Sequence, residues 1–335
     1  MSCKFKIVLL AGIIFCQITT AMGQQKGQWV PGQFGLNAGV IPDPGVNYAN
    51  LALNYSASQL NGPNGNSVPG INGSYSFWVD ENIIYYVPKH KFLGGYFMPY
   101  IALNYASGEL VAEITGTNLS GGGGGSGFAD TFVEPVNLGW HLKHADVNVG
   151  YAFTAPTGRF TQGASNNVGS GYWGNNLTGG MTYYITKNKG TSANLATVWE
   201  FHGQKSGTNI TPGQAFTIEW GFGQVLPLKK DFSRLLQLGL VGYDQWQVGK
   251  SSGTLIIAPP PVPPIAESSI PYYSVHAVGF QANFILPAKN LAAFFKFYDE
   301  YHALARPQGR TIVFGFSYTL RIPKPEPPKP QPAKP

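Results

Sequence analysis

The chain has 335 residues, with 22 Lys and Arg against 16 Asp and Glu, and only 11% of its residues are charged. An ordinary soluble domain carries about 25% charged residues. Gly and Pro make up about a fifth of the chain and aromatic residues 14%, so the apolar content excludes a disordered protein and the many poor helix formers exclude a helix bundle. No run of about 18 apolar residues is present, which excludes a helical membrane span. The composition predicts an all-β protein with many turns.

The first 23 residues have the three parts of a secretory signal peptide. Lys4 and Lys6 precede the apolar run 7–16, and small residues at 21–23 provide a cleavage site ahead of Gln24. Ten apolar residues are too few to cross a bilayer core of about 30 Å, so a membrane anchor is disfavoured. We therefore expect residues 1–23 to be removed on export.

Loss of the signal peptide has chemical consequences. Both cysteines, Cys3 and Cys16, leave with it, which excludes disulfides, thiolate metal sites and a cysteine nucleophile. The net charge falls by two, from +6 to +4, and gives no reason to expect a nucleic-acid partner. Nothing in the remaining sequence calls for a metal or cofactor.

Residues 24–44 lie between the signal peptide and the first predicted strand. They are polar and Gly-rich, with Trp29 and Phe34 as the large side chains. Two interpretations stay open, a plug folded into the interior of a barrel and a lead that remains in the periplasm.

Period-two alternation dominates the rest of the chain. In segments 146–154, 216–223 and 313–320, bulky and aromatic residues alternate with Gly, Asn, Thr and other small or polar residues. A soluble β-sandwich also alternates, with its apolar side toward a core. An aromatic side opposed to a small, polar side is the pattern of a barrel whose outside meets lipid and whose inside meets water.

Twelve segments of this kind predict twelve antiparallel strands, an even number as in bacterial single-chain barrels. The predicted strands are 45–57, 74–87, 92–106, 131–142, 145–155, 172–185, 193–203, 214–226, 234–248, 272–286, 291–303 and 310–322. The fold class is therefore an all-β transmembrane barrel spanning residues 45–322.

The connections alternate in length. The short ones are 88–91, 143–144, 186–192, 227–233 and 287–290, and the long ones are 58–73, 107–130, 156–171, 203–213 and 249–271. Outer-membrane barrels have short periplasmic turns and long outer loops, whereas a sandwich has no reason to alternate in this way. The aromatic residues near strand ends are typical of girdles at the two bilayer interfaces.

Three low-complexity segments accompany the barrel. The glycine run 121–127 lacks the Lys-Ser/Thr ending of a phosphate-binding loop and is predicted to be a flexible outer loop. Residues 259–264 (PPPVPP) stiffen another outer loop. The tail 323–335 is Pro-rich and is expected to be an extended, solvated periplasmic segment.

If the bulky face points outward, polar residues line the interior. That inward set includes Asn50 and Asn54, and its pore-lining candidates are Glu200, Glu219, Lys296, Glu300, Asn148, Gln281 and Asn283. Glu200 and Glu219 flank one outer loop, so antiparallel pairing could bring the two carboxylates together or beside Lys296. The functional hypothesis is a charged constriction that filters solutes. The alternative is a structural ion-pair network that fills the barrel.

Short motifs along the chain resemble one outer-membrane family. They are residues 28–32 (QWVPG), 41–46 (IPDPGV), 130–135 (DTFVEP), 138–141 (LGWH), 155–160 (APTGRF), 169–173 (GSGYW) and 242–247 (GYDQWQ). This family is named for the meta-cleavage pathway of phenol degradation, and the resemblance spans about residues 28–322. It implies a barrel that helps small hydrophobic or aromatic molecules cross the outer membrane. The last strand also resembles the signal read by the barrel-assembly machinery, with Gly315, Tyr318 and Leu320.

Three function classes follow. The first is a passive channel or transporter for small hydrophobic solutes in the bacterial outer membrane, with lipid and the assembly machinery as its other partners. The second is a structural or interaction barrel without transport. The third is a lipid-active enzyme. Outer-membrane phospholipases are barrels of similar strand number whose nucleophile motif resembles His-x-Ser-Asn-Gly, and this string does not occur here. We therefore expect no catalytic residues.

Overall fold

The computed structural model describes residues 27–116, 120–255 and 264–321. The predicted signal peptide 1–23, the tail 323–335 and most of the Pro-rich run 259–264 lie outside these ranges. Within the described residues, no helix is both long enough and apolar enough to cross a membrane.

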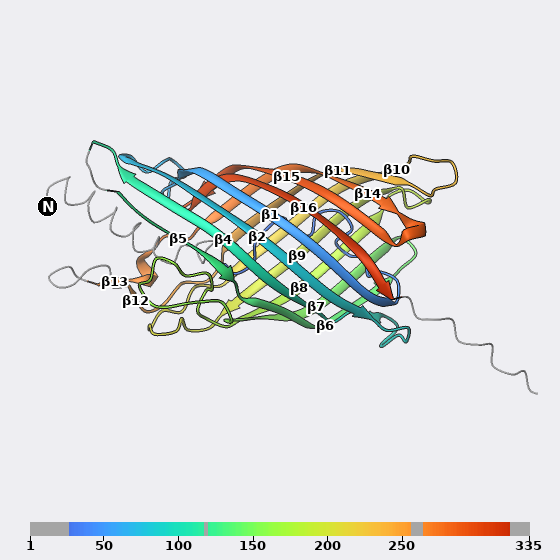
Figure 1. Ribbon diagram of the computed structural model, residues 1–335, viewed down its shortest axis with the longest axis horizontal. Coiled ribbons are helices and arrows are strands. Elements are labelled where there is room, and N and C mark those ends of the chain that lie inside the picture. Colours follow the sequence, from blue (N-terminus) through green and yellow to red (C-terminus); the bar gives the residue numbers. More distant parts are fainter. Residues whose placement is uncertain (1–26, 117–119, 256–263, 322–335) are drawn as a thin grey trace, which may run out of the picture.

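Twelve long strands form the barrel (Figure 1). They are β1 (Gly45–Leu60), β2 (Ile71–Val87), β4 (Tyr100–Ile114), β6 (Thr131–His141), β7 (Ala145–Ala155), β8 (Gly174–Tyr184), β9 (Thr191–His202), β10 (Ala215–Pro227), β11 (Leu235–Gln247), β14 (Ser274–Leu286), β15 (Leu291–Leu304) and β16 (Pro307–Arg321). Each pairs antiparallel with its neighbours, and β16 pairs with β1 to close the sheet. Closure leaves no open edge, as a sheet in lipid requires.

The remaining elements are short. β3 (Tyr96–Phe97) pairs with β6 just before β4 begins, and β5 (Ser120–Phe128) pairs with the far half of β4. β12 (Thr254–Leu255) and β13 (Ile265–Ala266) form a small separate ribbon, followed by the 3₁₀ turn η1 (Glu267–Ser269). A second 3₁₀ turn, η2 (Pro287–Lys289), joins β14 to β15.

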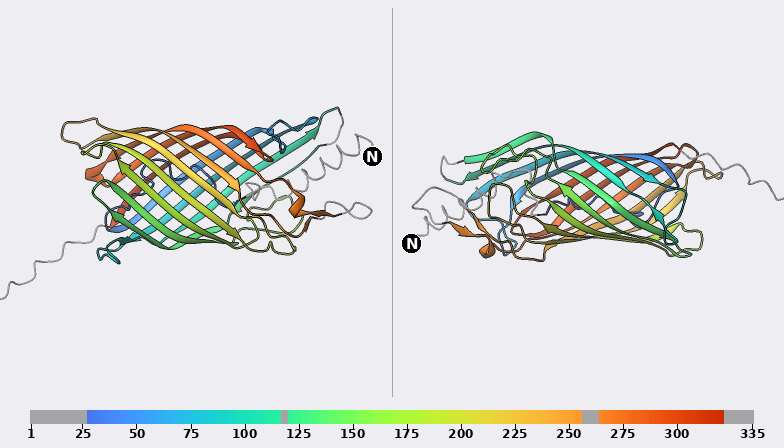
Figure 2. Two further views of the ribbon diagram at one scale, coloured as in Figure 1. Left: turned by 180° about the vertical axis from the view of Figure 1, so that it is seen from behind. Right: turned by 90° about the horizontal axis from the view of Figure 1, so that it is seen from below.

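The prediction of twelve antiparallel strands is confirmed, and most strand ends agree within about three residues. Short connections gather at one end of the barrel and most long ones at the other (Figures 1 and 2). By the loop-length rule we call these the periplasmic and the outer end. Two connections break the alternation. At the outer end only Ala305 and Arg306 join β15 to β16. At the periplasmic end residues 88–99, which include β3, join β2 to β4, so the prediction of a short turn at 88–91 and a strand from residue 92 is wrong.

The prediction for residues 107–130 is wrong. Instead of a loop, β4 continues to Ile114 and β5 returns beside it, from Glu113 paired with Ser120 to Tyr105 paired with Phe128. The glycine run 121–127 is thus part of a β-hairpin. In Figure 1 this hairpin lies beside β2 at the outer end of the barrel.

A close backbone approach explains why the strand is built of glycine. A Cβ at Gly123 would lie 2.5 Å from the carbonyl oxygen of Ser165, and one at Gly125 would lie 2.6 Å from that of Asn166. Arg159 completes this contact by donating from Nη2 to the Asn166 carbonyl at 2.7 Å. The glycines therefore allow the outer connection 156–173 to lie directly on the hairpin.

Replacing Gly125 with Val is expected to push this outer connection away while leaving the barrel folded. The backbone of residue 166 cannot yield as a flexible side chain would, so the local contact is lost. Limited proteolysis should show faster cutting within 156–173, with unchanged heat-modifiable migration on gels. Ser126→Val is the matched control because Ser126 lies on the exposed face of the same strand. Equal protection in both variants would contradict the packing argument.

The outer wall of the barrel is apolar. Large side chains that face away from the interior recur on nearly every strand, among them Trp78, Ile84, Tyr86, Val149, Leu177, Leu240, Phe280, Phe314 and Leu320. A contiguous surface of this kind is unfavourable in water and suits the hydrocarbon region of a membrane.

The inner wall has two different halves. On β8 to β15 it is mainly polar, whereas on β1, β2 and β4 it is apolar, with Leu51, Leu53, Tyr55, Tyr75 and Phe77 buried in one cluster. The prediction that Asn50 and Asn54 face inward is therefore wrong, because in β1 the odd-numbered residues are the buried ones.

The polar residues displaced to the outer wall satisfy one another. Asn50 Nδ2 donates to Asp80 Oδ1 at 2.6 Å, and Tyr48 donates to Asn82 Oδ1 at 2.5 Å. Mutual hydrogen bonding lowers the cost of polar groups on a wall that faces lipid.

Candidate functional site

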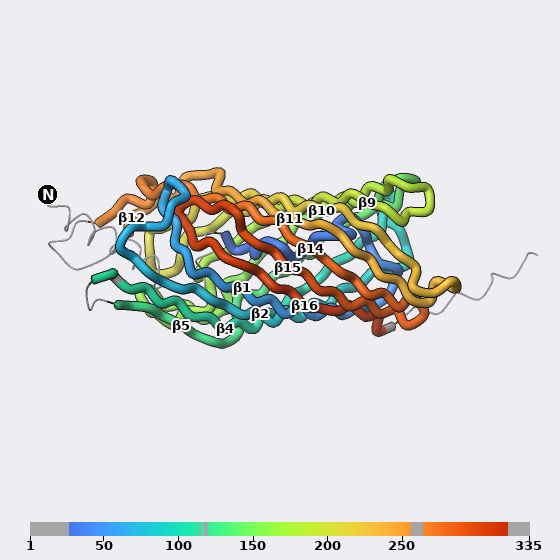
Figure 3. The backbone as a smooth tube through the Cα atoms, turned by 90° about the horizontal axis from the view of Figure 1, so that it is seen from above, coloured from blue at the N-terminus to red at the C-terminus, as the bar shows by residue number. Residues whose placement is uncertain are grey.

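Residues 27–44, here called the lumenal segment, run inside the barrel (Figure 3). Gln28 lies near the outer end, where its side chain donates to Ser170 and to the carbonyl oxygen of Tyr172. Gly39 lies near the periplasmic end, where its amide donates to Thr182 Oγ1 at 3.0 Å. The segment therefore crosses most of the length of the lumen before β1 begins.

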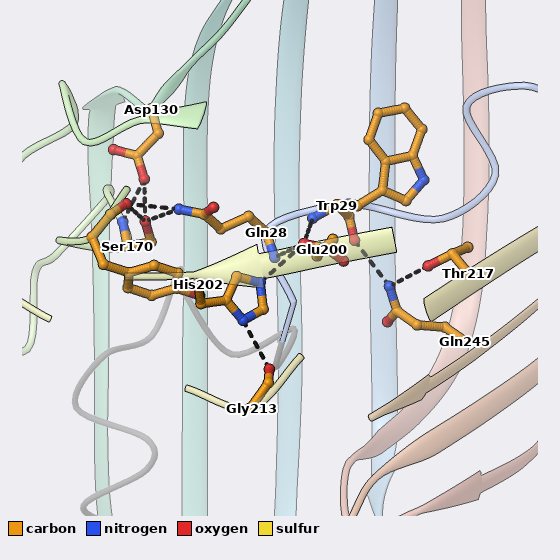
Figure 4. A network of polar contacts seen from close by, with 10 residues as sticks. Gln28, Trp29, Asp130, Ser170, Glu200, His202, Gly213, Thr217 and Gln245 are labelled. Atoms are coloured by element: carbon orange, nitrogen blue, oxygen red, sulfur yellow. Dashed lines mark hydrogen bonds and ion pairs between the residues drawn. The ribbon is translucent and has the colours of Figure 1, made fainter. Parts of the chain in front are cut away.

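Glu200 on β9 holds the start of the lumenal segment (Figure 4). Its Oε2 accepts from the backbone amides of Gln28 at 2.6 Å and Trp29 at 2.9 Å. The Trp29 carbonyl in turn accepts from Gln245 Nε2 at 3.2 Å. Hydrogen bonds to a charged group contribute about 1.5–3 kcal/mol each, so this carboxylate is a strong attachment point.

Glu219 and Lys296 hold the middle of the segment from different sides. Glu219, on β10, accepts from Trp29 Nε1 at 3.0 Å and from the Phe34 amide at 2.8 Å. Lys296 Nζ, on β15, donates to three consecutive carbonyls, those of Gly32, Gln33 and Phe34, at 3.1, 2.5 and 2.9 Å. Amides and carbonyls of one turn are thus bound by opposite charges, which fixes its direction in the lumen.

Amide side chains hold the part of the segment nearer the periplasm. Leu36 N donates to Gln281 Oε1 at 2.9 Å, and Asn148 Nδ2 donates to the Ala38 carbonyl at 3.0 Å. Asn37 exchanges two side-chain hydrogen bonds with Gln237, at 2.8 and 3.1 Å. These contacts join the lumenal segment to β7, β11 and β14.

All seven residues predicted as pore-lining candidates face the interior. Glu200, Glu219, Lys296, Asn148 and Gln281 bond the lumenal segment directly. Asn283 reaches it through Gln237, to which its Nδ2 donates at 2.8 Å.

Glu300 belongs to a separate buried network. It accepts from Tyr55 at 2.8 Å, from Tyr243 at 3.0 Å and from the Gly309 amide at 2.7 Å, and it lies 3.6 Å from Arg306. This arrangement joins β1, β11, β15 and β16 across the barrel. It matches the alternative of an ion-pair network better than a free charge in a channel.

The hypothesis of a paired Glu200 and Glu219 is wrong. In the register of β9 and β10, Glu200 lies opposite Ala215 and Glu219 opposite Ala196. The two carboxylates are offset along the barrel and bind successive parts of the lumenal segment. Glu200 also lies 3.4 Å from His202 Nε2, whereas Glu219 interacts electrostatically with Lys296, as expected for one of the two carboxylates.

A second polar cluster connects the outer loops to the segment (Figure 4). Asp130 accepts from the amides of Ser170 at 2.7 Å and Gly158 at 3.0 Å, and Ser170 also accepts from Gln28 Nε2 at 2.6 Å. Burial raises the pKa of Asp130 above its usual value, and these hydrogen bonds oppose that rise. The motifs 130–135 and 169–173 thus meet in space.

Three of the six histidines lie beside hydrogen-bond acceptors. His141 Nδ1 lies 3.0 Å from Asp146, His276 Nδ1 2.6 Å from Asp244, and His202 Nδ1 2.8 Å from the Gly213 carbonyl. Among the residues that the structure describes, no group of three or more His, Cys, Asp or Glu side chains could hold a metal ion.

The attachment of residues 27–44 to these side chains was not predicted from the sequence. The usable signal was a surplus of polar inward positions confined to β8–β15, together with a polar Gly-rich segment of suitable length before β1. Trp29 and Asn37 make several of these contacts. The sequence pattern marks Trp29 only as a large side chain and does not single out Asn37.

The closed antiparallel sheet with its apolar exterior defines the class of this protein, a β-barrel of the bacterial outer membrane. The family model described as "Putative MetA-pathway of phenol degradation" matches residues 57–316, and the chain belongs to this family.

Solved structures share the fold. An outer membrane channel from Pseudomonas putida F1 is 14% identical with a TM-score of 0.64, covering 87% of this chain and 99% of that chain. The transport unit of the autotransporter AIDA-I from Escherichia coli is 11% identical with a TM-score of 0.50, covering 91% of this chain and 97% of that chain. At such identities the similarity concerns the fold alone. Comparison with curated protein sequences gave no match.

Proposed function

We propose that the protein is a passive channel or transporter for small, hydrophobic or aromatic compounds, and that its lumenal segment closes the path at rest. The observation that carries the proposal is the lumen itself. A non-covalently held segment crosses it, and the wall beside that segment is apolar on one half. A wall of Leu, Tyr and Phe side chains lowers the cost of moving an apolar solute past it.

The segment fits the role of a removable plug. Its polar contacts to the wall are hydrogen bonds, which water can replace once the segment moves, whereas Trp29 and Leu36 pack into apolar clusters with wall residues. The strand ladder closes between β1 and β16 without residues 27–44. Family membership and the channel from Pseudomonas putida F1 with the same fold support this proposal.

The second candidate is a structural barrel without transport. The Glu300 network and the filling of the lumen by residues 27–44 are the observations that support it. A catalytic role has less support. In the described part of the chain, the hydrogen-bonding partners found for His141, His202 and His276 include no serine hydroxyl.

Uptake measurements test the proposal. Cells that produce the protein should take up small aromatic and aliphatic compounds faster than cells that lack it, with no change for a sugar of similar size. The sugar controls for general leakage of the outer membrane. Equal uptake of every hydrophobic compound in the two strains would support the structural barrel instead.

A further inference from the structure

A cavity of about 130 Å³ lies between the lumenal segment and the inner wall of β1, β2, β4 and β6. Its apolar lining includes Leu51, Leu53, Tyr75, Phe77, Val79 and Phe132. An engineered apolar cavity of about 150 Å³ in another protein takes up benzene. The volume is therefore suited to one six-membered ring.

Two acceptor side chains stand together on this apolar wall. Glu81 of β2 and Asn104 of β4 are direct cross-strand partners, and both line the cavity. Asn104 Nδ2 donates to the Asp130 carbonyl at 3.0 Å, which fixes the amide orientation and leaves Oδ1 as an acceptor. This oxygen is buried and has no hydrogen-bond partner among the described residues.

Within the described part of the chain, the Glu81 carboxylate, like Asn104 Oδ1, is an acceptor without a hydrogen-bond donor. It is only 7% exposed, and no side-chain or backbone donor in the described residues hydrogen bonds to it. A buried acceptor without a donor costs about 1–3 kcal/mol, and more when it is charged. Two adjacent acceptors for which the described residues offer no donor, on a wall that is otherwise apolar, fit a ligand that brings a donor.

The charge of Lys296 limits what that ligand can be. Lys296 and Glu81 interact electrostatically within the lumen. An ammonium ligand would add a second cation beside Lys296, whereas a neutral donor such as a hydroxyl adds none. The arrangement therefore favours a neutral donor over a cation.

We propose that this cavity binds a single-ring aromatic molecule carrying one neutral hydrogen-bond donor, with the ring against the β1–β2 wall and the donor on Glu81 and Asn104. The proposal rests on the proposed function, since it specifies which compounds the lumen accepts. It assigns selectivity to Glu81 and Asn104, neither of which bonds the lumenal segment in the described structure.

Ligand titration of the purified full chain in detergent tests the proposal. Phenol, toluene and benzylamine share one ring and differ in the donor, and calorimetry or saturation-transfer NMR gives their affinities. We expect phenol to bind roughly tenfold more tightly than toluene, the effect of one hydrogen bond to a charged acceptor. Glu81→Leu should reduce this preference to nearly none while toluene still binds.

Matched variants separate the site from general effects. Asp80→Asn changes the neighbouring residue, which is exposed on the opposite face of β2, and should keep the wild-type preference. Val79→Trp should fill the cavity and abolish binding of both ligands. If Glu81→Leu does not fold, as judged by heat-modifiable migration, Asn104→Ala provides the same comparison.

Several results would overturn the proposal. They are equal affinity for phenol and toluene, a phenol preference that survives in the acceptor variants, tightest binding of benzylamine, or no binding by the wild type. Because these titrations need no membrane, they are independent of transport. A protein that binds phenol but leaves cellular uptake unchanged would contradict the proposed function and leave this inference standing.

Discussion

Deletion of residues 27–43 is expected to turn a mostly closed barrel into a persistently open one. The deleted residues occupy the lumen from the level of Ser170 to that of Thr182. Their removal leaves a lumen with polar side chains on one half of its wall, which water can fill. Single-channel recordings in planar bilayers should show a mean conductance about tenfold or more above that of the full chain, as expected for an unfilled lumen of twelve strands.

The deletion should not unfold the barrel. All twelve strand pairings that close the sheet lie outside the deleted range. Heat-modifiable migration and the circular dichroism of β-structure serve as controls for folding. A folded deletion variant with the conductance of the full chain would contradict the assignment of these residues as the plug.

Lys296→Met is expected to loosen the lumenal segment from its middle. The substitution leaves three backbone carbonyls without their donor and removes the positive charge that lies near Glu219. Removing one partner from a buried charged contact costs about 3–5 kcal/mol. Because the strand ladder is untouched, the loss should appear as a higher open probability and as faster protease cutting within 27–44.

A double substitution tests whether the two charges act together. Lys296→Met combined with Glu219→Gln should cost less than the sum of the two single changes, because the remaining charge is then no longer unpaired. Lys229→Met, in an exposed periplasmic turn, is the control for loss of one lysine. Additive effects, or an effect as large in the control, would contradict this role for Lys296.

The barrel could be predicted because its physics is local. Alternation along each strand and the lengths of the connections are properties of neighbouring residues, and both survive in the structure. The hairpin at 107–130 escaped because glycine has no strand preference of its own. Glycine is needed in β5 because the carbonyl oxygens of Ser165 and Asn166, more than 30 positions away in sequence, lie directly against the strand.

The inner wall could be predicted only in part. Period two shows that two faces differ, but it does not say which one meets water. On β8–β15 the polar face is inside, as expected, whereas on β1 and β2 the large apolar residues Leu51, Tyr55 and Phe77 point inward. On these strands the apolar inner wall faces Trp29 and Val30 of the lumenal segment. This arrangement depends on contacts between residues far apart in sequence.

The partners of the candidate residues were equally out of reach. Glu200, Glu219 and Lys296 were correctly placed on the inward face, but their bonds go to residues 28–34, between 160 and 270 positions away. No periodic signal records such a pairing.

One measurement tests most directly whether the lumenal segment controls the channel. Cysteines introduced at Asn37 and Gln237, whose side chains exchange hydrogen bonds of 2.8 and 3.1 Å, should be joined by a short bifunctional thiol reagent that forms a disulfide with each cysteine. We predict that this cross-link abolishes channel openings and that its reduction restores them. Complete cross-linking with unchanged conductance would show that solutes pass the segment without moving it, and would contradict the account.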